Sequence, residues 1–252
     1  MMTNSLRYSG GAGFTNVYST EFDGVDDYID CGDNDNLSFG DGSTDSPFSI
    51  SAWIKIPSGS KGFYVCSKQR YDSPPSRDEY AFYISGSSEE LIFYLFDLDL
   101  YYRRGRKTDV ISIFDEWFHV AATYNGVGGS SAQNGMKIYV NGVRSDTTDS
   151  TLNTYTAMHN TTEPFRIGAF TVGQISPDGN ADEVAIFNSA LSSSDVTAIY
   201  NSGVPNDLSS YSSLISWWRF EEGSGTTAID SGSGGNDGTL TNGTAYSTDV
   251  PT

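Results

Sequence analysis

The chain has 252 residues, and its 32 acidic and 14 basic side chains give a formal net charge of -18. A surface this acidic excludes broad contact with nucleic acid or an anionic membrane, because both need cationic patches. No stretch approaches the roughly 20 apolar residues of a membrane-spanning helix, and the first residues lack the apolar centre of a secretory signal. The 27 glycines, 8 prolines and 13% aromatic residues indicate an all-β chain with many tight turns.

The first 16 residues are polar and rich in glycine, which is typical of an arm at the end of a domain. We interpret residues 1–16 as an N-terminal arm and residues 17–252 as one domain. The arm is expected to contact neighbouring copies of the chain or another protein.

The stretch EFDGVDDYID, residues 21–30, interrupts an alternating strand pattern with a glycine and adjacent carboxylates. Burial of an unpaired carboxylate costs several kcal/mol, so Asp23, Asp26 and Asp27 need a cation or backbone donors. Calcium takes such oxygen ligands at high coordination number. An alternative is an Asx-type turn, in which these side chains bond their own backbone.

Residues 48–56, FSISAWIKI, alternate strictly between apolar and polar side chains, which predicts a half-buried strand. On the polar face, Trp53 either lies under a second layer or forms an exposed platform. Further strands are expected at 62–68, 80–85, 91–98, 117–125, 165–170 and 181–187. The predicted core comprises Ile50, Ala52, Ile54, Val120, Ile138, Val140, Ile167, Val184 and Ile186.

The segment YYRRGRK, residues 101–107, places four of the fourteen basic residues around Gly105. We expect it at a hairpin tip. Either these side chains are solvated, as most charge runs are, or they dock to an acidic neighbour. The candidate docking residues are Arg103, Arg104, Arg106 and Lys107.

The residues most often used in catalysis are sparse. His119 lies in an apolar strand pattern and is interpreted as a core residue, and no serine or cysteine nucleophile is recognisable beside a histidine. Cys31 and Cys66 could pair, but small buried thiols are the favoured interpretation.

Two local signals are sharp. Asn141-Gly142 lies between alternating runs and predicts a type I′ hairpin turn. In LSSSDVTAIYNSG, residues 191–203, apolar side chains follow one helical stripe, with Ser192 and Asp195 as a capping box and Gly203 as the stop. We therefore predict one short helix near residues 192–202, followed by closing strands from residues 206–243, at 214–220 and near 239–240.

Six motifs in order, among them FSISAWIKI, WFHVAATY, MKIYVNG and ADEVAIFNSALS, resemble the laminin G-like jelly rolls of the concanavalin A-like lectin/glucanase superfamily. The resemblance covers most of residues 17–243 and implies a two-sheet antiparallel jelly-roll sandwich with a calcium site at its edge. Asp182 of the ADEV motif would join Asp23, Asp26 or Asp27 as a ligand. The segment from Trp218 to Leu240 closes the domain, whereas in many members it opens it. This circularly permuted order is similar to versions in phage and other virion-associated proteins.

Three functions follow as hypotheses. We favour a non-catalytic structural or adhesion module on a virion surface or another extracellular surface, whose partners are neighbouring copies or other surface proteins. The alternative is a calcium-dependent carbohydrate-binding module of a secreted or cell-surface protein. Its candidate stacking residues are Trp53, Tyr71, Tyr83, Tyr94 and Tyr101. The third is a glycoside hydrolase using the carboxylates of Glu21-x-Asp23-x-x-Asp26, although that motif calls for glutamate at the last position.

Overall fold

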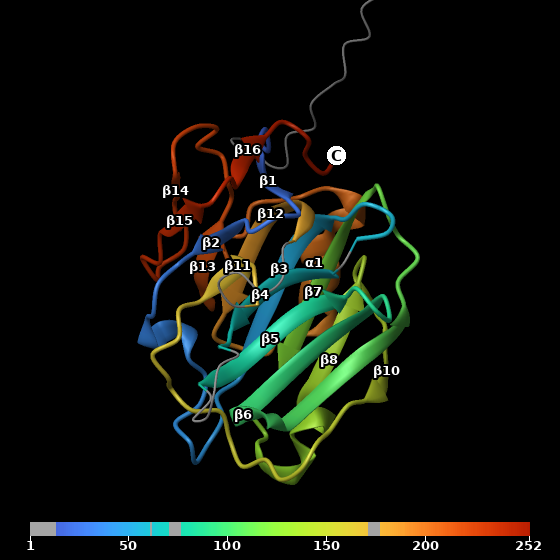
Figure 1. Ribbon diagram of the computed structural model, residues 1–252, viewed down its shortest axis with the longest axis vertical. Helices are drawn as coiled ribbons and strands as arrows, with labels where there is room; N and C mark the ends of the chain where they lie inside the picture. The colour runs from blue at the N-terminus through green and yellow to red at the C-terminus, as the bar shows by residue number, and fades with distance from the viewer. Residues whose placement is uncertain (1–13, 61, 71–76, 171–176) are drawn as a thin grey trace, which may run out of the picture.

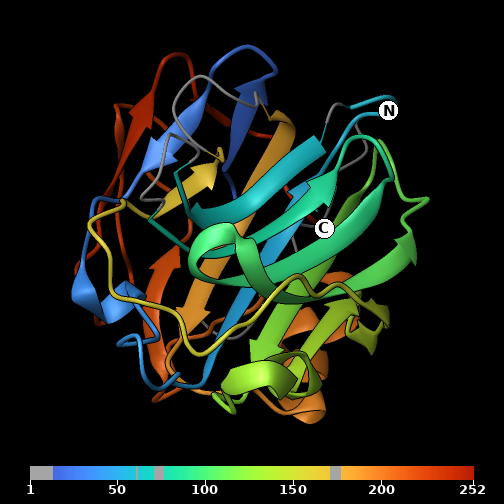
Figure 2. The same cartoon turned by 60° about the horizontal axis from the view of Figure 1, so that its bottom comes forward.

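The computed structural model describes residues 14–60, 62–70, 77–170 and 177–252. Two antiparallel β-sheets pack face to face, with β4, β5 and β6 in front of β3, β7 and β12 in Figure 1; Figure 2 shows the same two layers from below. The predicted all-β sandwich is confirmed. Tyr71 lies outside the described residues, as do residues 1–13 of the predicted arm.

Sheet A has the order β16-β1-β12-β3-β7-β8-β9, and β13 pairs with the second half of β12. Its strands are β1 (Ser19–Asp23), β3 (Phe48–Lys55), β7 (Trp117–Tyr124), β8 (Met136–Val140), β9 (Val143–Arg144), β12 (Asp178–Phe187), β13 (Leu214–Trp218) and β16 (Ala245–Ser247).

Sheet B has the order β10-β6-β5-β4-β11-β2-β15-β14. Its strands are β2 (Tyr28–Asp30), β4 (Gly62–Lys68), β5 (Asp78–Ser85), β6 (Glu90–Val110), β10 (Asp146–Asp149), β11 (Arg166–Gly168), β14 (Thr227–Ala228) and β15 (Gly238–Thr241). Short 3-10 turns lie at η1 (Asp35–Leu37) and η2 (Gly129–Gly135).

The main core fills the space between the sheets, where alternate residues of each strand point inward. Eight of the nine predicted core residues are fully buried there, and Val140 packs against them partly buried. Phe48 shows how aromatic rings fill the layer. Its ring stacks on Phe39 at 4.2 Å between centroids and lies edge-on to Phe93 at 5.7 Å.

The closing segment, residues 206–243, contributes strands to both sheets. Strand β13 pairs with β12 in sheet A, whereas β15 pairs with β2 in sheet B. The strand expected near residues 239–240 is present as β15. One more strand, β16, follows it and pairs with β1.

Helix α1 (Ser193–Tyr200) begins as expected: the Ser192 hydroxyl accepts the Asp195 N–H, and the Asp195 side chain accepts the Ser192 N–H. Its C-cap is Asn201 with a φ of 47°, two residues before the expected Gly203. A third 3-10 turn, η3 (Asn201–Gly203), follows the helix. The helix lies on the outer face of sheet A, where Tyr200 stacks on Trp53 at 5.9 Å.

The Asn141-Gly142 turn is confirmed, since both residues have positive φ, 48° and 75°, as a type I′ turn requires. Cys31 and Cys66 are free and buried. Among the residues that the structure describes, no helix has the length and apolar character needed to span a membrane.

The prediction that residues 101–107 form a hairpin tip is wrong. The 21 residues of β6 fold back on themselves: the Ile111 N–H donates to the Glu89 carbonyl at 2.7 Å, and Leu98 has a φ of 61°. The reversal therefore lies near Leu98, and the basic segment runs along the returning half of β6.

There the basic side chains have partners within the chain. The Arg104 guanidinium is buried and donates to the Asn153 carbonyl at 2.9 Å, and the Lys107 ammonium pairs with Glu90 at 2.8 Å. Arg106 pairs with Asp146 and Asp149, and the Arg103 guanidinium lies 4.7 Å from the centroid of the Tyr94 ring. Docking by this segment, which stays a prediction, would have to compete with these contacts.

Candidate functional site

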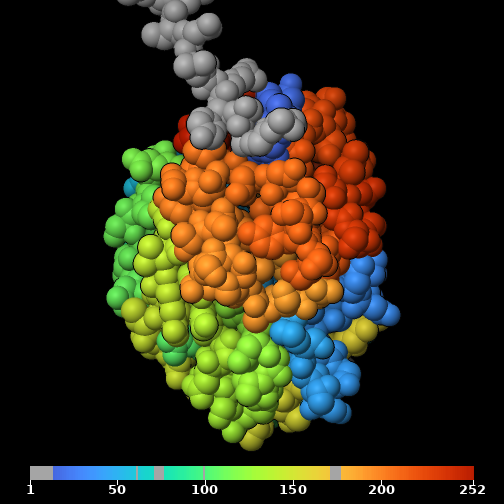
Figure 3. Space-filling model, turned by 180° about the vertical axis from the view of Figure 1, so that it is seen from behind, coloured from blue at the N-terminus to red at the C-terminus, as the bar shows by residue number. Residues whose placement is uncertain are grey.

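The middle of the outer face of sheet A is closed to solvent. Helix α1 and the segment after it, orange in Figure 3, lie over this face. Trp53 is only 3% exposed beneath them. Of the two alternatives for Trp53, the structure therefore supports the cover of a second layer, and this ring is not available to stack on a sugar.

Two acidic residues are buried under this layer. Asp182 and Glu183 lie at a bulge between β12 and β3, where Glu183 has a φ of 50°. One oxygen of Asp182 accepts the Asn16 amide at 2.9 Å, and the other accepts the Glu183 N–H at 2.8 Å. The Glu183 carboxylate accepts the indole N–H of Trp217, and the Arg219 guanidinium lies 3.5 Å from its other oxygen.

Burial disfavours the charged form of both carboxyl groups. Burial raises the pKa of Glu183 to about 8, although the nearby Arg219 and the Trp217 indole act to lower it. Burial and the adjacent Glu183 raise the pKa of Asp182 well above its ordinary value. At neutral pH the Glu183 carboxyl is therefore held largely in its protonated form.

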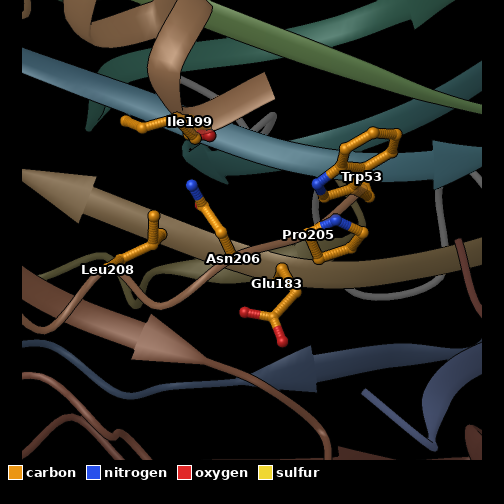
Figure 4. Close-up of a pocket in the computed structure, with 7 residues that line it drawn as sticks. Trp53, Glu183, Ile199, Pro205, Asn206 and Leu208 are labelled. Carbon is orange, nitrogen blue, oxygen red and sulfur yellow. The ribbon is translucent and has the colours of Figure 1, made fainter. Parts of the chain in front are cut away.

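The hollow beside Glu183 is lined by Ser51, Trp53, Glu183, Ile199, Pro205, Asn206 and Leu208, most of them labelled in Figure 4. Its volume of about 10 Å³ is close to what one water molecule needs. It cannot admit a sugar.

The fold also forms a serine–histidine pair that the sequence analysis missed. Ser51 Oγ lies 2.8 Å from Nε2 of His119, because β3 and β7 are neighbours in sheet A. Both side chains are buried, and burial lowers the pKa of His119 to about 3, so its ring is neutral. Within the described residues, Nδ1 of His119 has no hydrogen-bond partner. The expectation that His119 is a core residue is confirmed.

The expected calcium ligands do not all lie together. Asp23, Asp26 and Asp27 share the turn after β1, but β1 runs antiparallel to β12 with Asp23 opposite Asp178 and Thr20 opposite Ala181. Asp182 therefore lies about four residues, or roughly 13 Å, along the ladder from Asp23. Over the described parts of the chain, no three His, Cys, Asp or Glu side chains are arranged to hold a metal.

The turn itself retains one feature that fits a cation. One oxygen of Asp27 accepts the Asp23 N–H at 2.8 Å, whereas the other is buried without a partner among the described residues. Burial raises the pKa of Asp27, as expected for an uncompensated carboxyl group. Asp23 bonds the Val25 N–H at 2.8 Å, which is the Asx-type alternative. Calcium binding here, without Asp182, stays a prediction.

Two of the proposed stacking residues belong to an aromatic cluster on the outer face of sheet B. Tyr83 lies parallel to Tyr64 at 4.6 Å and 6.2 Å from Tyr94. The sequence analysis did not identify Tyr64. Because these rings pack on one another and Tyr94 is only 8% exposed, little of their faces is free. Tyr101 is 55% exposed.

A second cleft opens at one end of sheet A, and its lining includes no residue of α1. Its volume is about 140 Å³, and it is lined by Glu21, Phe22, Lys55, Pro57, Asp115, Asp178, Gly179 and Asn180. Strand pairing forms one row across three strands: Glu21 of β1 lies opposite Asn180 of β12, which lies opposite Lys55 of β3. At Gly179, φ is 133° and an added Cβ would lie 2.2 Å from the Lys55 carbonyl, so only glycine fits.

The cleft contains polar groups with unused hydrogen-bonding capacity. Among the described residues, the side chains of Glu21, Asp115, Asp178 and Asn180 form no hydrogen bond or ion pair. The three carboxylates are exposed, whereas Asn180 is nine-tenths buried and faces the cleft. Neither polar atom of Asn180 is among the fully buried atoms without a partner, so the amide reaches the cleft and can bond a ligand there.

The one basic side chain that the described residues place in the cleft already has an acidic partner. Lys55 Nζ pairs with the Asp249 carboxylate at 2.7 Å, and the other oxygen of Asp249 accepts the Trp117 indole N–H at 2.9 Å. Burial acts to raise the pKa of Asp249, but the bonds from Lys55 and Trp117 hold it below its ordinary value. The three free carboxylates therefore determine the charge of the cleft.

Comparisons with known proteins agree with this fold. A family model described as the concanavalin A-like lectin/glucanases superfamily matches residues 23–197. A candidate carbohydrate-binding protein from Bacteroides ovatus superposes with a TM-score of 0.60 at 16% identity, covering 94% of this chain and 61% of that one. The binding domain of botulinum neurotoxin serotype G has a TM-score of 0.51 at 14% identity, covering 78% and 47%. No curated protein matches the chain.

Proposed function

The chain belongs to the concanavalin A-like lectin/glucanases superfamily, and we propose that it is a non-catalytic adhesion module that binds a glycan in the cleft between β1, β12 and β3. The observation that carries this proposal is the set of four unpartnered polar side chains lining that cleft, with Asn180 nine-tenths buried among them. Binding sites combine a concave surface with a few convergent polar groups in this way.

The chemistry of the cleft suits a polyhydroxylated ligand. Carboxylate oxygens only accept hydrogen bonds, and the Asn180 amide both donates and accepts. Sugar hydroxyls supply both roles. Pro57, which is half-buried, lines the same cleft and offers apolar surface to the C–H face of a ring, whereas Phe22 behind it belongs to the core. The volume of about 140 Å³ lies below the range of drug-sized pockets and suits a single sugar residue of a longer chain.

The relatives add support at the level of the fold. One structural neighbour is a candidate carbohydrate-binding protein and another is a toxin binding domain. At identities of 16% and 14%, their binding residues cannot be assigned to positions in this chain. This chain also spans only 61% and 47% of those chains. The position of the site therefore depends on the cleft alone.

The non-catalytic part of the proposal is supported by the state of the candidate acids. The glycosidase hypothesis needs two carboxyl groups in the motif's positions, whereas Asp26 stands where the motif calls for glutamate, and one oxygen of Asp23 accepts the Val25 N–H of its own turn. Neither the fold nor the reported relatives support the attachment to a virion that the sequence analysis favoured.

The test is a glycan array probed with the protein and with Asn180→Ala. We expect selective binding by the protein and loss of signal in the variant. The matched control is Glu116→Gln, because Glu116 is exposed, adjoins Asp115 and is not among the residues lining the cleft. Equal binding by the protein and Asn180→Ala would remove the cleft as the site. Release of reducing ends from a bound oligosaccharide would contradict a non-catalytic role.

A further inference from the structure

We infer that the cleft selects sugars bearing a protonated amine over neutral sugars, and that it rejects sialylated or sulfated glycans. This inference rests on the proposed function, since it names the ligand class of the same site. It derives from the charges around Asn180, the buried amide that faces the cleft without a described partner.

Three carboxylates approach this amide from different directions. Glu21 lies directly opposite Asn180 on β1, at the spacing of about 5 Å between Cβ atoms that cross-strand pairs share. Asp178 is two residues away on β12 and points to the same face. The Asp115 N–H donates to the Ile56 carbonyl at 2.8 Å, which holds Asp115 at the end of β3.

No cation among the described residues balances this set. Lys55 is the only basic residue lining the cleft, and its ammonium is bound to Asp249. Asp249 is held in turn by the Trp117 indole, so the ion pair is anchored at both ends. A ligand that enters the cleft therefore meets three uncompensated negative charges, which attract an ammonium group and repel a carboxylate or sulfate.

The size of the cleft and its mixed lining favour an amino sugar over a bare metal ion. The half-buried Pro57 gives one side an apolar surface that a hydrated ion would not use. The Asn180 amide can donate to a hydroxyl beside the ammonium. An amine on a sugar ring supplies the charge, the hydroxyls and the apolar face together.

Isothermal titration with two disaccharides that differ only in N-acetylation tests this inference. The probes are β-1,4-linked glucosamine disaccharide, whose amines are protonated at about pH 6, and its fully N-acetylated form. At low salt we expect the amine form to bind roughly three- to tenfold more tightly, the range for one to three partly exposed charge pairs. Added salt should reduce this ratio.

General attraction of a cation to an acidic protein must be separated from binding in the cleft. The double variant Glu21→Gln/Asp178→Asn changes the net charge only from -18 to about -16. General attraction of a cation to the protein would therefore hardly change. We expect the preference to disappear in this variant and to persist in Glu89→Gln/Glu116→Gln, which removes two charges from residues that do not line the cleft. A sialylated disaccharide should bind neither the protein nor the control variant Glu89→Gln/Glu116→Gln.

The outcomes distinguish the two proposals. If the N-acetylated disaccharide binds in an Asn180-dependent way as tightly as the amine form, the inference about ligand class is overturned and glycan binding stands. A preference that survives in Glu21→Gln/Asp178→Asn also overturns it. If Asn180→Ala changes the binding of neither probe nor of any array glycan, the proposed function itself fails. Competition by calcium alone at micromolar levels would identify a cation site in place of an amine site.

Discussion

Replacement of Glu183 by glutamine should remove much of the pH dependence of stability. The Glu183 carboxyl of β12 is buried against the Trp217 indole, and burial raises its pKa to about 8 from an ordinary 4.5. A carboxyl with a raised folded-state pKa holds its proton more tightly in the folded chain than in the unfolded chain. Its contribution to stability is complete below about pH 4.5 and is lost as pH rises through about 8.

The ordinary pKa and the raised pKa of Glu183 together set an upper limit for the stability that its ionisation removes. A difference of between three and four pH units corresponds to about 5 kcal/mol at 1.36 kcal/mol per unit. The value of about 8 already includes the attraction of Arg219, which lies 3.5 Å away and acts to lower the pKa. Glu221 acts against the ionisation of Glu183. We therefore expect about 2–4 kcal/mol lost between pH 5 and pH 9.

The assay is urea denaturation of the protein and of Glu183→Gln at several values between pH 5 and pH 9. The variant keeps an acceptor for the Trp217 indole but carries no charge, so its unfolding free energy should fall less with pH and exceed that of the protein at pH 9. Glu116→Gln, at an exposed position, should retain the full slope. Equal slopes for the protein and Glu183→Gln would refute the assignment of the slope to this carboxyl group.

Three further predictions concern other parts of the chain. If calcium binds the turn at Asp27, calcium at 100 times Kd should add about 2.7 kcal/mol of stability, and melting temperatures that are identical in chelator and in calcium would dismiss the site. Gly142→Ala should cost about 1 kcal/mol or more in denaturant unfolding, because φ is 75° and the new Cβ would lie 2.9 Å from Tyr200; an unchanged midpoint would count against the strained turn. Burial raises the pKa of both Cys31 and Cys66, so a thiol reagent should modify them only after unfolding, and rapid labelling of the native protein would contradict their burial.

Local patterns in the sequence predict local structure well. Strict alternation in residues 48–56 places Ile50, Ala52 and Ile54 in the core, because successive side chains of a strand point to opposite faces. The Asn141-Gly142 pair and the capping box at Ser192 depend on residues a few positions apart, so they too are readable from the sequence.

Long-range register is what the sequence does not contain. Asp182 belongs to a recognisable motif, yet its position relative to Asp23 depends on how β1 slides along β12. The same holds for the cleft, whose row of Glu21, Asn180 and Lys55 joins residues from three separate strands. The alternation of apolar and polar residues predicts a polar face for each of these three residues. Only the pairing of β1, β12 and β3 shows that they are neighbours.

The reversal within β6 escaped prediction for a different reason. Leu98 takes a positive φ that a leucine rarely adopts, so no glycine or asparagine marks the turn. The glycine among the arginines, Gly105, instead lies against Tyr94, where an added Cβ would come within 2.3 Å of the ring. A glycine required for close packing was interpreted as one required for a turn.

The pairing of β2 with β15 has a consequence for how the chain folds. Ile29 of β2 lies opposite Leu240, and Thr20 of β1 lies opposite both Ala181 and Tyr246, so the first strands find their neighbours only in the last third of the chain. Such high contact order slows folding, because the entropy of closing long loops is lost before the contacts form. During synthesis, the opening strands must wait on the ribosome until β11 (Arg166–Gly168) and β12 (Asp178–Phe187) emerge, with their hydrogen-bonding edges open to other molecules.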